Sequence, residues 1–441
     1  MENWKNVLHI FVTVFLSNFA SLLVNPTIAD VTMEAVCPGK DECSLAIYLT
    51  GFQQAVGGLG SVFMMPLIGN LSDTYGRKVL LNIPLILAII PTATLAVSRT
   101  TEFFYVYYVL KIFTAMVTEG GVICLSSGYL ADNVSEANRV SVFGIMAGVV
   151  SAANVCGTLV ARLLPTGRIF QVAAAAAVAA AVYMRIFLQE KPQEADPLEH
   201  PILKSATENN QVEKEALTNA DVIKKISLPK AIIRLLRSSF TVSLASIVVF
   251  FCSLADAGVQ AFLMYYLKAR FHFQKDQFAD ILLITYIAAT VSNMVVMPAL
   301  SKFMAEETML CIGLFAGFLN MLFDSIAWAP WVPYASALLG LICFMAGPSI
   351  RCIISKKVGP YEQGIAQGCL MGIAALANVV SPLIYSPLSA LFLSDGAPFY
   401  FPGFSMLCVG LAWLIAFLLS TLIKIGPILW KDRSSEPCLL A

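Results

Sequence analysis

Apolar runs of about 20 residues, separated by short polar breaks, follow one another along most of the chain. A helix of about 20 apolar residues spans the hydrocarbon core of a bilayer. The pattern therefore predicts twelve membrane-spanning helices. Their predicted bounds are residues 7–30, 46–68, 79–98, 103–130, 139–163, 168–189, 238–265, 279–300, 308–327, 331–354, 364–392 and 398–424. The first run is longer than the core of a signal peptide and no small-residue cleavage site follows it, so we expect it to remain as a helix.

The composition supports an all-α membrane protein whose surroundings are the lipid bilayer. Hydrophobic residues make up 58% of the 441 residues and charged residues 13%, whereas soluble domains carry about 25% charged residues. Mean hydropathy is +0.77. The 28 basic residues balance the 28 acidic residues, so the charge gives no indication of a nucleic-acid partner.

One long polar connection divides the predicted helices into two sets of six. It suggests an N-terminal six-helix bundle (1–189), a flexible cytosolic linker (190–237), a C-terminal six-helix bundle (238–424) and a cytosolic tail (425–441). The stretch MPLIGNLSDTYGRKVLL, which starts at Met65, has a faint echo in MPALSKFMAEETML, which starts at Met297. Duplicated six-helix units are common in transporters. We therefore predict two pseudo-symmetric bundles, with chance similarity as the alternative for the echo.

The distribution of lysine and arginine predicts the orientation in the membrane. If both termini are cytosolic, 20 of the basic residues fall on inner segments and 7 on outer segments, and Lys111 lies within a span. An excess of basic residues on the cytosolic side is the usual arrangement. We expect a multi-pass protein with both termini in the cytosol. The choice between the plasma membrane and an endomembrane such as the vacuole stays open.

The decamer GNLSDTYGRK, Gly69 to Lys78, is a polar break between the second and third predicted spans. Gly69 and Gly76 allow a tight turn and a close approach of helices. Asp73 is suited to accept N–H bonds from a helix N-terminus, where the helix dipole favours an anion. The start of the eleventh span, near Gly364, is the candidate N-terminus.

Arg77 of the same decamer can pair with Asp132 at the inner end of the fourth span. Together with the contact of Asp73, this pair would hold the inner side of the protein closed. The alternative interpretation is an ordinary positively charged cytosolic loop.

These residues resemble the signature loop of the major facilitator superfamily, in which a Gly, an Asp four residues later and Gly-Arg-Lys join the second and third spans. The stretch SGYLADNVSEANRVSVFGIMAG (127–148) is similar to the loop between spans four and five of tetracycline-efflux-like members. The stretch EQGIAQGCLMGIAALANVVSPL (362–383) is similar to their span eleven. The whole chain most resembles the hippocampus-abundant-transcript-like branch, and we expect a plant member.

This resemblance implies a transporter with a conformational switch at its inner side. We call this set of residues the inner gate; it consists of Gly69, Asp73, Gly76, Arg77, Lys78, Asp132 and Arg139.

Two charged residues of the fourth span are the first candidates for a substrate or proton pathway. Ionisable side chains are costly in lipid and are retained mainly for function. Resemblance places Lys111 where the family often has an arginine facing the central cavity. On a continuous helix, Glu119 would lie about 80° around from Lys111, so the two would not be stacked. A buried structural pair is the alternative.

Other polar residues of the spans are weaker candidates. Asp256 and Gln260 share one face of the seventh span and line either a cavity or an interface. Asp30, Asp324 and Arg351 lie near span ends, and we interpret each as an interface residue. Further pathway candidates, each of which is equally suited to an interhelical hydrogen bond, are Asn18, Asn25, Gln53, Gln54, Asn154, Asn293 and Asn378.

Cys37 and Cys43, in CPGKDEC, share one polar loop and would form a disulfide if that loop faces an oxidising space. The three histidines are scattered, so we predict no metal site and no cofactor. No glycine-rich nucleotide loop and no catalytic cluster is found in the sequence, so we do not expect an enzyme.

The sequence also departs from bacterial tetracycline exporters. Residues 14–17 hold no carboxylate, and Gly157 is followed by Thr158 where those exporters have Gly-Pro. Tetracycline is therefore a poor guess for the substrate. We predict a secondary active transporter of a small organic solute, with protons as a candidate coupling ion. A non-transporting receptor or trafficking adaptor that keeps the fold is the alternative.

The predicted orientation can be tested by glycosylation. The two sequons, at Asn70 and Asn133, fall on segments that we place in the cytosol. After expression in eukaryotic cells, we expect glycosidase treatment to leave the electrophoretic mobility unchanged, with the Asn70→Gln variant as reference. A glycan on Asn70 would invert the topology.

Overall fold

In the computed structural model, the described residues are 4–36, 38, 44–189, 239–273, 275–359, 362–392 and 398–433, and all regular elements among them are helices. They are α1 (Trp4–Val36), α2 (Ser44–Tyr75), α3 (Arg77–Val97), α4 (Thr101–Thr118), α5 (Gly121–Asn133), α6 (Arg139–Leu163), α7 (Thr166–Phe187), α10 (Phe240–Phe271), α11 (Lys275–Val291), the π-helix η1 (Ser292–Val296), α12 (Met297–Leu300), α13 (Glu306–Ser325), α14 (Val332–Ala337), α15 (Gly340–Cys343), α16 (Ala346–Lys357), α17 (Gln363–Phe392) and α18 (Phe404–Arg433).

Twelve of these helical stretches are long and apolar enough to cross a membrane, which confirms the predicted count. Their ends agree with the sequence-based bounds to within a few residues at most positions. The second span differs most, because it runs on to Tyr75 and carries Asp73 with it. The predicted linker, 190–237, and the cysteines Cys37 and Cys43 lie outside the described residues. The proposed domain boundaries therefore stay a prediction.

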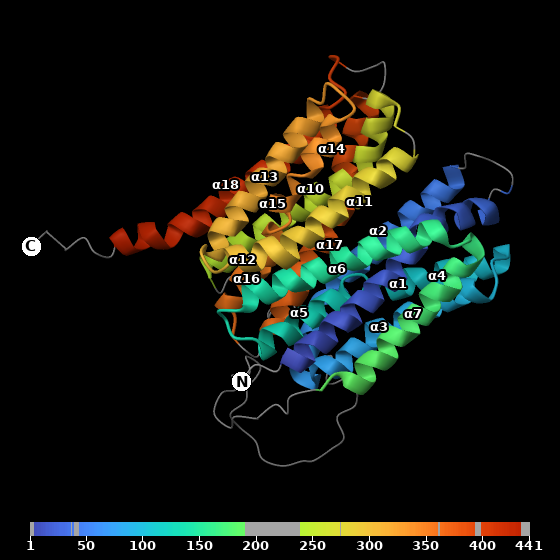
Figure 1. The fold of residues 1–441 in the computed structure, drawn as a ribbon, viewed down its shortest axis with the longest axis horizontal. Coiled ribbons are helices and arrows are strands. Elements are labelled where there is room, and N and C mark those ends of the chain that lie inside the picture. The colour runs from blue at the N-terminus through green and yellow to red at the C-terminus, as the bar shows by residue number, and fades with distance from the viewer. Residues whose placement is uncertain are drawn as a thin grey trace, which may run out of the picture.

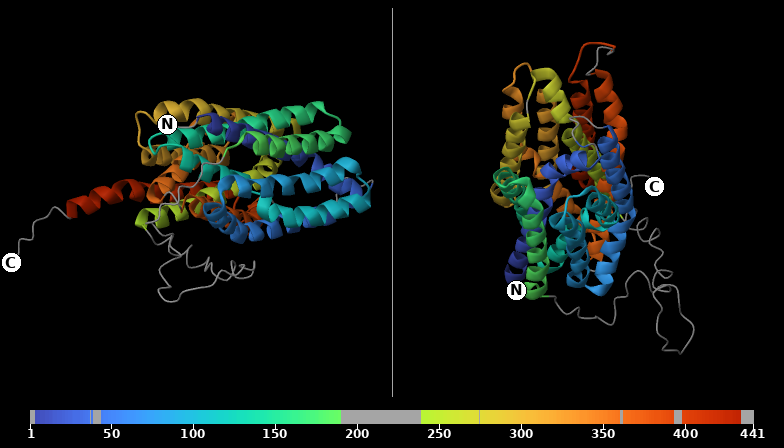
Figure 2. Two further views of the ribbon diagram at one scale, coloured as in Figure 1. Left: turned by 90° about the horizontal axis from the view of Figure 1, so that it is seen from below. Right: turned by 90° about the vertical axis from the view of Figure 1, so that its right-hand side faces the viewer.

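The helices lie alongside one another in an elongated bundle, and the start of α1 and the end of α18 lie at the same end of it (Figures 1 and 2). One buried core is built only from residues between Leu244 and Ile423. A second core is built mostly from residues between Val7 and Leu188, and a third lies between Leu23 and Ala173. The two sets of helices thus pack largely around separate interiors.

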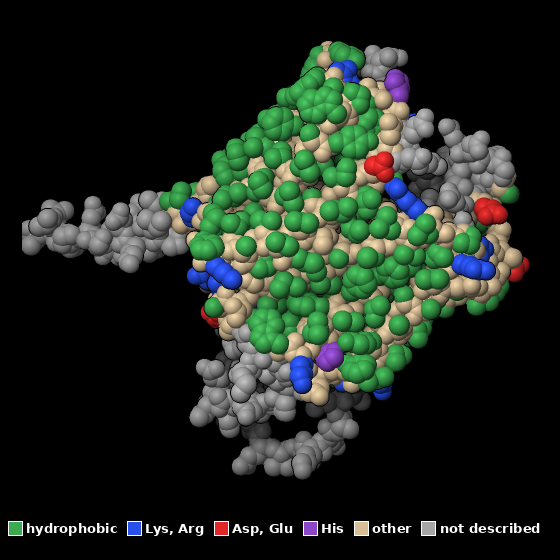
Figure 3. Space-filling view, in the orientation of Figure 1, with side chains coloured by type: hydrophobic (Ala, Val, Ile, Leu, Met, Phe, Trp, Pro, Cys, Tyr) green, Lys and Arg blue, Asp and Glu red, His purple; other side chains and the backbone are tan. Residues whose placement is uncertain are grey.

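The outer surface suits a bilayer. Hydrophobic side chains cover most of the face shown in Figure 3, and charged side chains lie mainly at its margins. Large apolar side chains such as Phe63 (72% exposed) and Phe240 (72% exposed) point outward on the spans. Their exposure would be unfavourable in water, but it is favourable against lipid chains.

The helices α2 and α17 make the closest contact between the two sets. A Cβ added to Gly69 would collide with the carbonyl oxygen of Gly364, and one added to Gly368 would collide with that of Met65. Only glycine permits this approach of backbone to backbone. Gly69 and Gly368 therefore serve close helix packing at this crossing.

The fourth span is not one continuous helix, contrary to our expectation. The helix α4 ends at Thr118, and α5 begins at Gly121. Between them Gly120 has a φ of 90°, which side chains with a Cβ rarely adopt. The break redirects the chain after Glu119, whose N–H still donates to the carbonyl of Ala115 as in a continuous helix. The eighth span is also irregular, since η1 is inserted in it.

Asn133 is a poor reporter of topology in this fold. Its side chain is 7% exposed, and its Nδ2 donates a hydrogen bond to the carbonyl of Tyr129 over 2.8 Å. A glycan on this buried amide would not fit in the folded protein, whichever side of the membrane it faces. The glycosylation test therefore rests on Asn70.

The close crossing of α2 and α17 predicts a specific cost for a methyl group. Gly69→Ala should destabilise the protein by about 1–3 kcal/mol, because backbone must move to admit the Cβ. Gly51→Ala is the matched control in the same helix, since a Cβ there meets nothing within 4 Å. Thermal unfolding in detergent should show a lower midpoint for Gly69→Ala alone. Equal midpoints for the two variants would contradict the packing argument.

Candidate functional site

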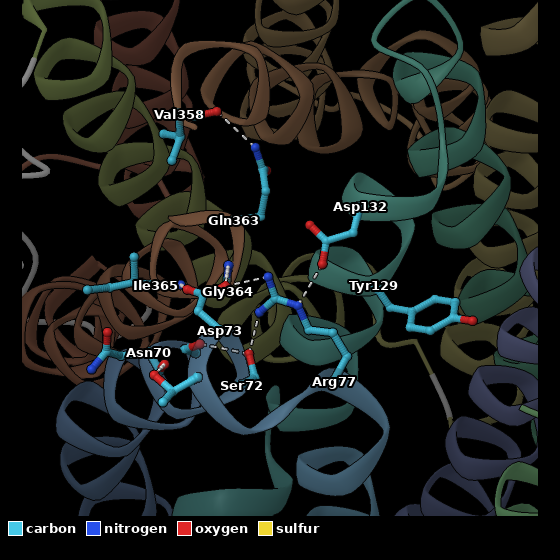
Figure 4. A network of polar contacts seen from close by, with 12 residues as sticks. Asn70, Ser72, Asp73, Arg77, Tyr129, Asp132, Val358, Gln363, Gly364 and Ile365 are labelled. Carbon is cyan, nitrogen blue, oxygen red and sulfur yellow. Dashed lines mark hydrogen bonds and ion pairs between the residues drawn. The ribbon is translucent and has the colours of Figure 1, made fainter. Parts of the chain in front are cut away.

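The carboxylate of Asp73, near the end of α2, lies against the first turn of α17 (Figure 4). The N–H of Gly364 donates to its Oδ1 over 2.9 Å, and the N–H of Ile365 donates to its Oδ2 over 2.8 Å. The Asp73 side chain is 8% exposed. The first N–H groups of a helix lack partners within that helix and carry its positive dipole end. The contact expected from the sequence is therefore present, and it joins the two sets of helices.

Arg77 binds both carboxylates of this network, those of Asp73 and Asp132 (Figure 4). It forms an ion pair with Asp73, and its Nε donates to Oδ2 of Asp132 over 2.9 Å. Its guanidinium also donates to the hydroxyl of Ser72. A Cβ on Gly128 would lie 3.2 Å from the guanidinium carbon, so the glycine leaves room for it. Arg77 thus ties the ends of α2, α3 and α5 together.

Gly76 explains how Arg77 reaches this position. Its φ of 95° turns the chain sharply between α2 and α3. Arg77 then occupies the first position of α3, with a side chain that is 8% exposed. Lys78 follows it and is half-buried. A β-carbon at position 76 would strain this turn.

A second contact between the sets of helices lies beside the first. Arg139, at the start of α6, donates from Nη1 to the carbonyl of Ser355 over 3.1 Å. The same Nη1 lies 3.8 Å from Oε1 of Glu136. Ser355, near the end of α16, in turn donates from its hydroxyl to Oε1 of Gln363 over 2.7 Å. Sequence reasoning missed Ser355 and Gln363, since neither is charged.

Lys111 and Glu119 form an ion pair at the break of the fourth span. Nζ of Lys111 lies 3.4 Å from Oε1 of Glu119, and the side chains are 28% and 52% exposed. The two side chains meet although we expected them not to be stacked. Both are long enough to bridge the two helical turns between their Cα atoms.

The other pathway candidates do not join this pair. Asp256 and Gln260 are both exposed on α10, and the nearest contact of Asp256 is the Cys252 sulfur, which donates to Oδ2 over 3.9 Å. Asn18 donates to the carbonyl of Val14 within its own helix. The remaining candidates on α2 are Gln53, which is half-buried, and Gln54, which is exposed. The side chain of Asn25 lies outside those that the structure describes.

Arg351 lies inside the protein rather than at a simple span end. Its Nη1 is 3.3 Å from Oε1 of Gln367, and its Nη2 is 3.6 Å from the sulfur of Met371. We interpreted Arg351 as an interface residue because it lies near the end of an apolar run. The spacing by four of Gln363, Gln367 and Met371 was the missed signal, since it places them on one face of α17.

One further ion pair joins the sets of helices at the opposite end of the bundle from Asp73. Nη2 of Arg162, at the end of α6, lies 3.6 Å from Oδ1 of Asp280 in α11. The two side chains are 42% and 55% exposed, so water screens this attraction. The inner contacts are therefore the stronger link between the two sets.

Comparison with known proteins identifies a family and relatives. The family model described as Major Facilitator Superfamily matches residues 10–369. The hippocampus abundant transcript 1 protein of Mus musculus is 24% identical over 395 residues, which is 88% of this chain and 74% of that protein. The class H tetracycline resistance protein of Pasteurella multocida is 22% identical over 447 residues, with 99% of each covered. The crystal structure of the human organic anion transporter MFSD10 superposes with a TM-score of 0.73 at 18% identity, over 94% of this chain and 99% of that one.

These similarities confirm the resemblances that the sequence suggested. The structural likeness extends over nearly the whole chain and confirms the twelve-helix fold. A plant origin stays a prediction.

The contact of Asp73 with α17 predicts the effect of removing its charge. Asp73→Asn should weaken the closed inner side by about 3 kcal/mol, because charge-assisted hydrogen bonds and a buried ion pair are lost. A cysteine introduced beneath the crossing of α2 and α17 should then react faster with a membrane-impermeant thiol reagent from the Asp73 side. Glu102→Gln is the control, since that carboxylate is exposed in the first turn of α4. Equal reaction rates in the two variants would show that Asp73 does not hold this side closed.

Proposed function

Because the chain belongs to the Major Facilitator Superfamily, we propose that it is a secondary active transporter that moves a small organic solute across the membrane by alternating access. In such proteins two halves rock around a site near the middle of the bilayer. The observation that carries the proposal is the Lys111–Glu119 pair, which lies at a helix break inside a span. A protein without a solute to bind gains nothing from two charges at such a place.

The inner gate supplies the moving contact in this proposal. Asp73, Arg77 and Asp132 all lie in the first set of helices, and the N–H groups of Gly364 and Ile365 that bind Asp73 come from the second set. When the two sets separate, Asp73 loses its helix N-terminus but keeps Arg77. No buried charge is left alone, so opening avoids the large cost of an unpaired ion.

Protons are the coupling ion that the pair favours. Protonation of Glu119 would remove its attraction for Lys111 and free the ammonium group. The affinity of the site for a solute would then change with the protonation of this pair. Asp256, which is also exposed, is the second candidate carrier.

The orientation follows from the charges of the connecting segments. With both termini in the cytosol, the inner gate faces the cytosol, and the Arg162–Asp280 pair lies on the outer side. The structure would then correspond to a state closed toward the cytosol.

The charges of the fourth span predict the result of a flux assay. In reconstituted liposomes, Glu119→Gln and Lys111→Ala should each lower solute flux by roughly tenfold or more, because each removes a charged group from the proposed solute site and a hydrogen bond to such a group contributes about 1.5–3 kcal/mol. Glu102→Gln is the matched control, since Glu102 is exposed in the first turn of the same helix. A pH gradient should change the flux of the wild type and of this control.

Two outcomes separate the parts of the proposal. Flux that ignores both the pH gradient and Glu119→Gln would remove proton coupling and leave a uniporter. No flux of any solute in a broad panel, with normal cellular behaviour of both variants, would favour a receptor or adaptor.

A further inference from the structure

Two polar pairs link α16 and α17, one helical turn apart, and they differ in how well they are satisfied. In the inner pair, Oε1 of Gln363 accepts a hydrogen bond from the Ser355 hydroxyl, and Nε2 of Gln363 donates to the carbonyls of Ser355 (2.8 Å) and Val358 (3.0 Å). In the pair one turn deeper, Arg351 reaches Gln367 over 3.3 Å. The inner pair is complete in itself, whereas the deeper pair leaves donors unused.

The unused donors of the deeper pair are a charge and an amide. Among the described residues Arg351 has no carboxylate within ion-pair distance, and its Nη2 has only the sulfur of Met371 at 3.6 Å. Gln367 is fully buried, and its Nε2 has no hydrogen-bond partner in the described part of the chain. A cation without a counter-ion and an N–H group without an acceptor are costly within a membrane span, which makes them candidates for binding a missing anion.

The other set of helices offers N–H groups to the same place. A Cβ on Gly120 would lie 3.5 Å from the sulfur of Met371, and Nη2 of Arg351 lies 3.6 Å from the same sulfur, so Gly120 and Arg351 are both close to it. Gly120 immediately precedes α5, a helix of 13 residues. The first N–H groups of this helix lack partners within it and carry its positive dipole end.

The charge balance around the break of the fourth span points to an anion. Lys111 and Glu119 neutralise each other, and Arg351 adds one positive charge that no described carboxylate compensates. Asp256 does not provide the missing negative charge, since its contact is with Cys252. One guanidinium, one amide N–H and a helix N-terminus together match the two oxygens and single charge of a carboxylate.

We propose that Arg351, Gln367 and the N-terminus of α5 bind the carboxylate group of a small organic anion. The inference rests on the proposed transport function and names its substrate class. Since α5 belongs to one set of helices and Arg351 to the other, the bound carboxylate would bridge both sets. Binding would thereby offset the repulsion between Arg351 and the positive end of α5 while the two sets are closed on each other.

A binding measurement that does not depend on transport tests this site. Purified protein in detergent is titrated with benzoate and succinate, and with the neutral analogues benzamide and succinamide, while thermal unfolding is recorded. We expect the carboxylates, but not the amides, to raise the unfolding midpoint. Arg351→Gln should raise the carboxylate concentration needed for half-saturation by roughly tenfold to a hundredfold, as expected for the loss of a charged hydrogen-bond donor. Arg351→Lys should retain part of the response.

Two further variants test whether the response depends on a free Arg351 and whether loss of any basic residue has the same effect. Gln367→Glu places a carboxylate beside Arg351, so it should raise the unfolding midpoint without ligand and abolish the response to benzoate. Lys302→Ala is the control for removal of a basic residue, since Lys302 is exposed and far along the chain from this pair. Its response should equal that of the wild type.

The outcomes distinguish this inference from the proposed function. A midpoint that rises equally with carboxylates and amides, no rise with either, or an equal rise in Arg351→Gln would overturn the carboxylate site. Flux of a cationic or neutral solute that persists in Arg351→Gln would also overturn it, but it would leave the transport function intact. Carboxylate binding that requires Arg351, with no flux of any solute, would support the site and count against transport.

Discussion

The contact between the carboxylate of Asp73 and the N-terminus of α17 is the constraint around which the closed end of the molecule is built. Two backbone N–H groups donate to this carboxylate at 2.9 and 2.8 Å. For such short bonds the end of α2 must touch the first turn of α17 with no side chain between them. Gly69, Gly364 and Gly368 meet that requirement, because a Cβ on any of them would collide with a neighbouring group. The glycines are thus a consequence of the carboxylate contact.

The same contact determines where the other charges lie. A carboxylate that is 8% exposed needs a cation as well as N–H donors. Arg77 provides it, and Gly76, with its positive φ, turns the chain so that Arg77 begins α3 beside Asp73. Arg77 also forms an ion pair with Asp132. All three charges belong to one set of helices, so the contact between sets is a charge against a helix end and can break without separating an ion pair.

The extent to which the sequence predicts this structure depends on the kind of feature. Apolar run length predicts the twelve spans, because lipid imposes a minimum helix length. The contact of Asp73 near Gly364 is predictable from the Gly-Asp-Gly-Arg pattern and the helix dipole. The Lys111–Glu119 contact is harder to predict, since the two residues are not stacked on the helix and meet only because their side chains are long. Arg351 shows a further limit, because run length locates span ends but not which way a side chain points.

The break at Gly120 connects these features at the middle of the fourth span. Before the break, Glu119 at the end of α4 lies 3.4 Å from Lys111 of the same helix, so the two charges pair within one span. After the break, α5 begins close to Met371, whose sulfur lies 3.6 Å from Nη2 of Arg351. The N-termini of α17 and α5 therefore differ in one respect. The first already holds a carboxylate from the chain itself, whereas the second faces a cation, an arrangement that an acceptor from outside the chain would complete.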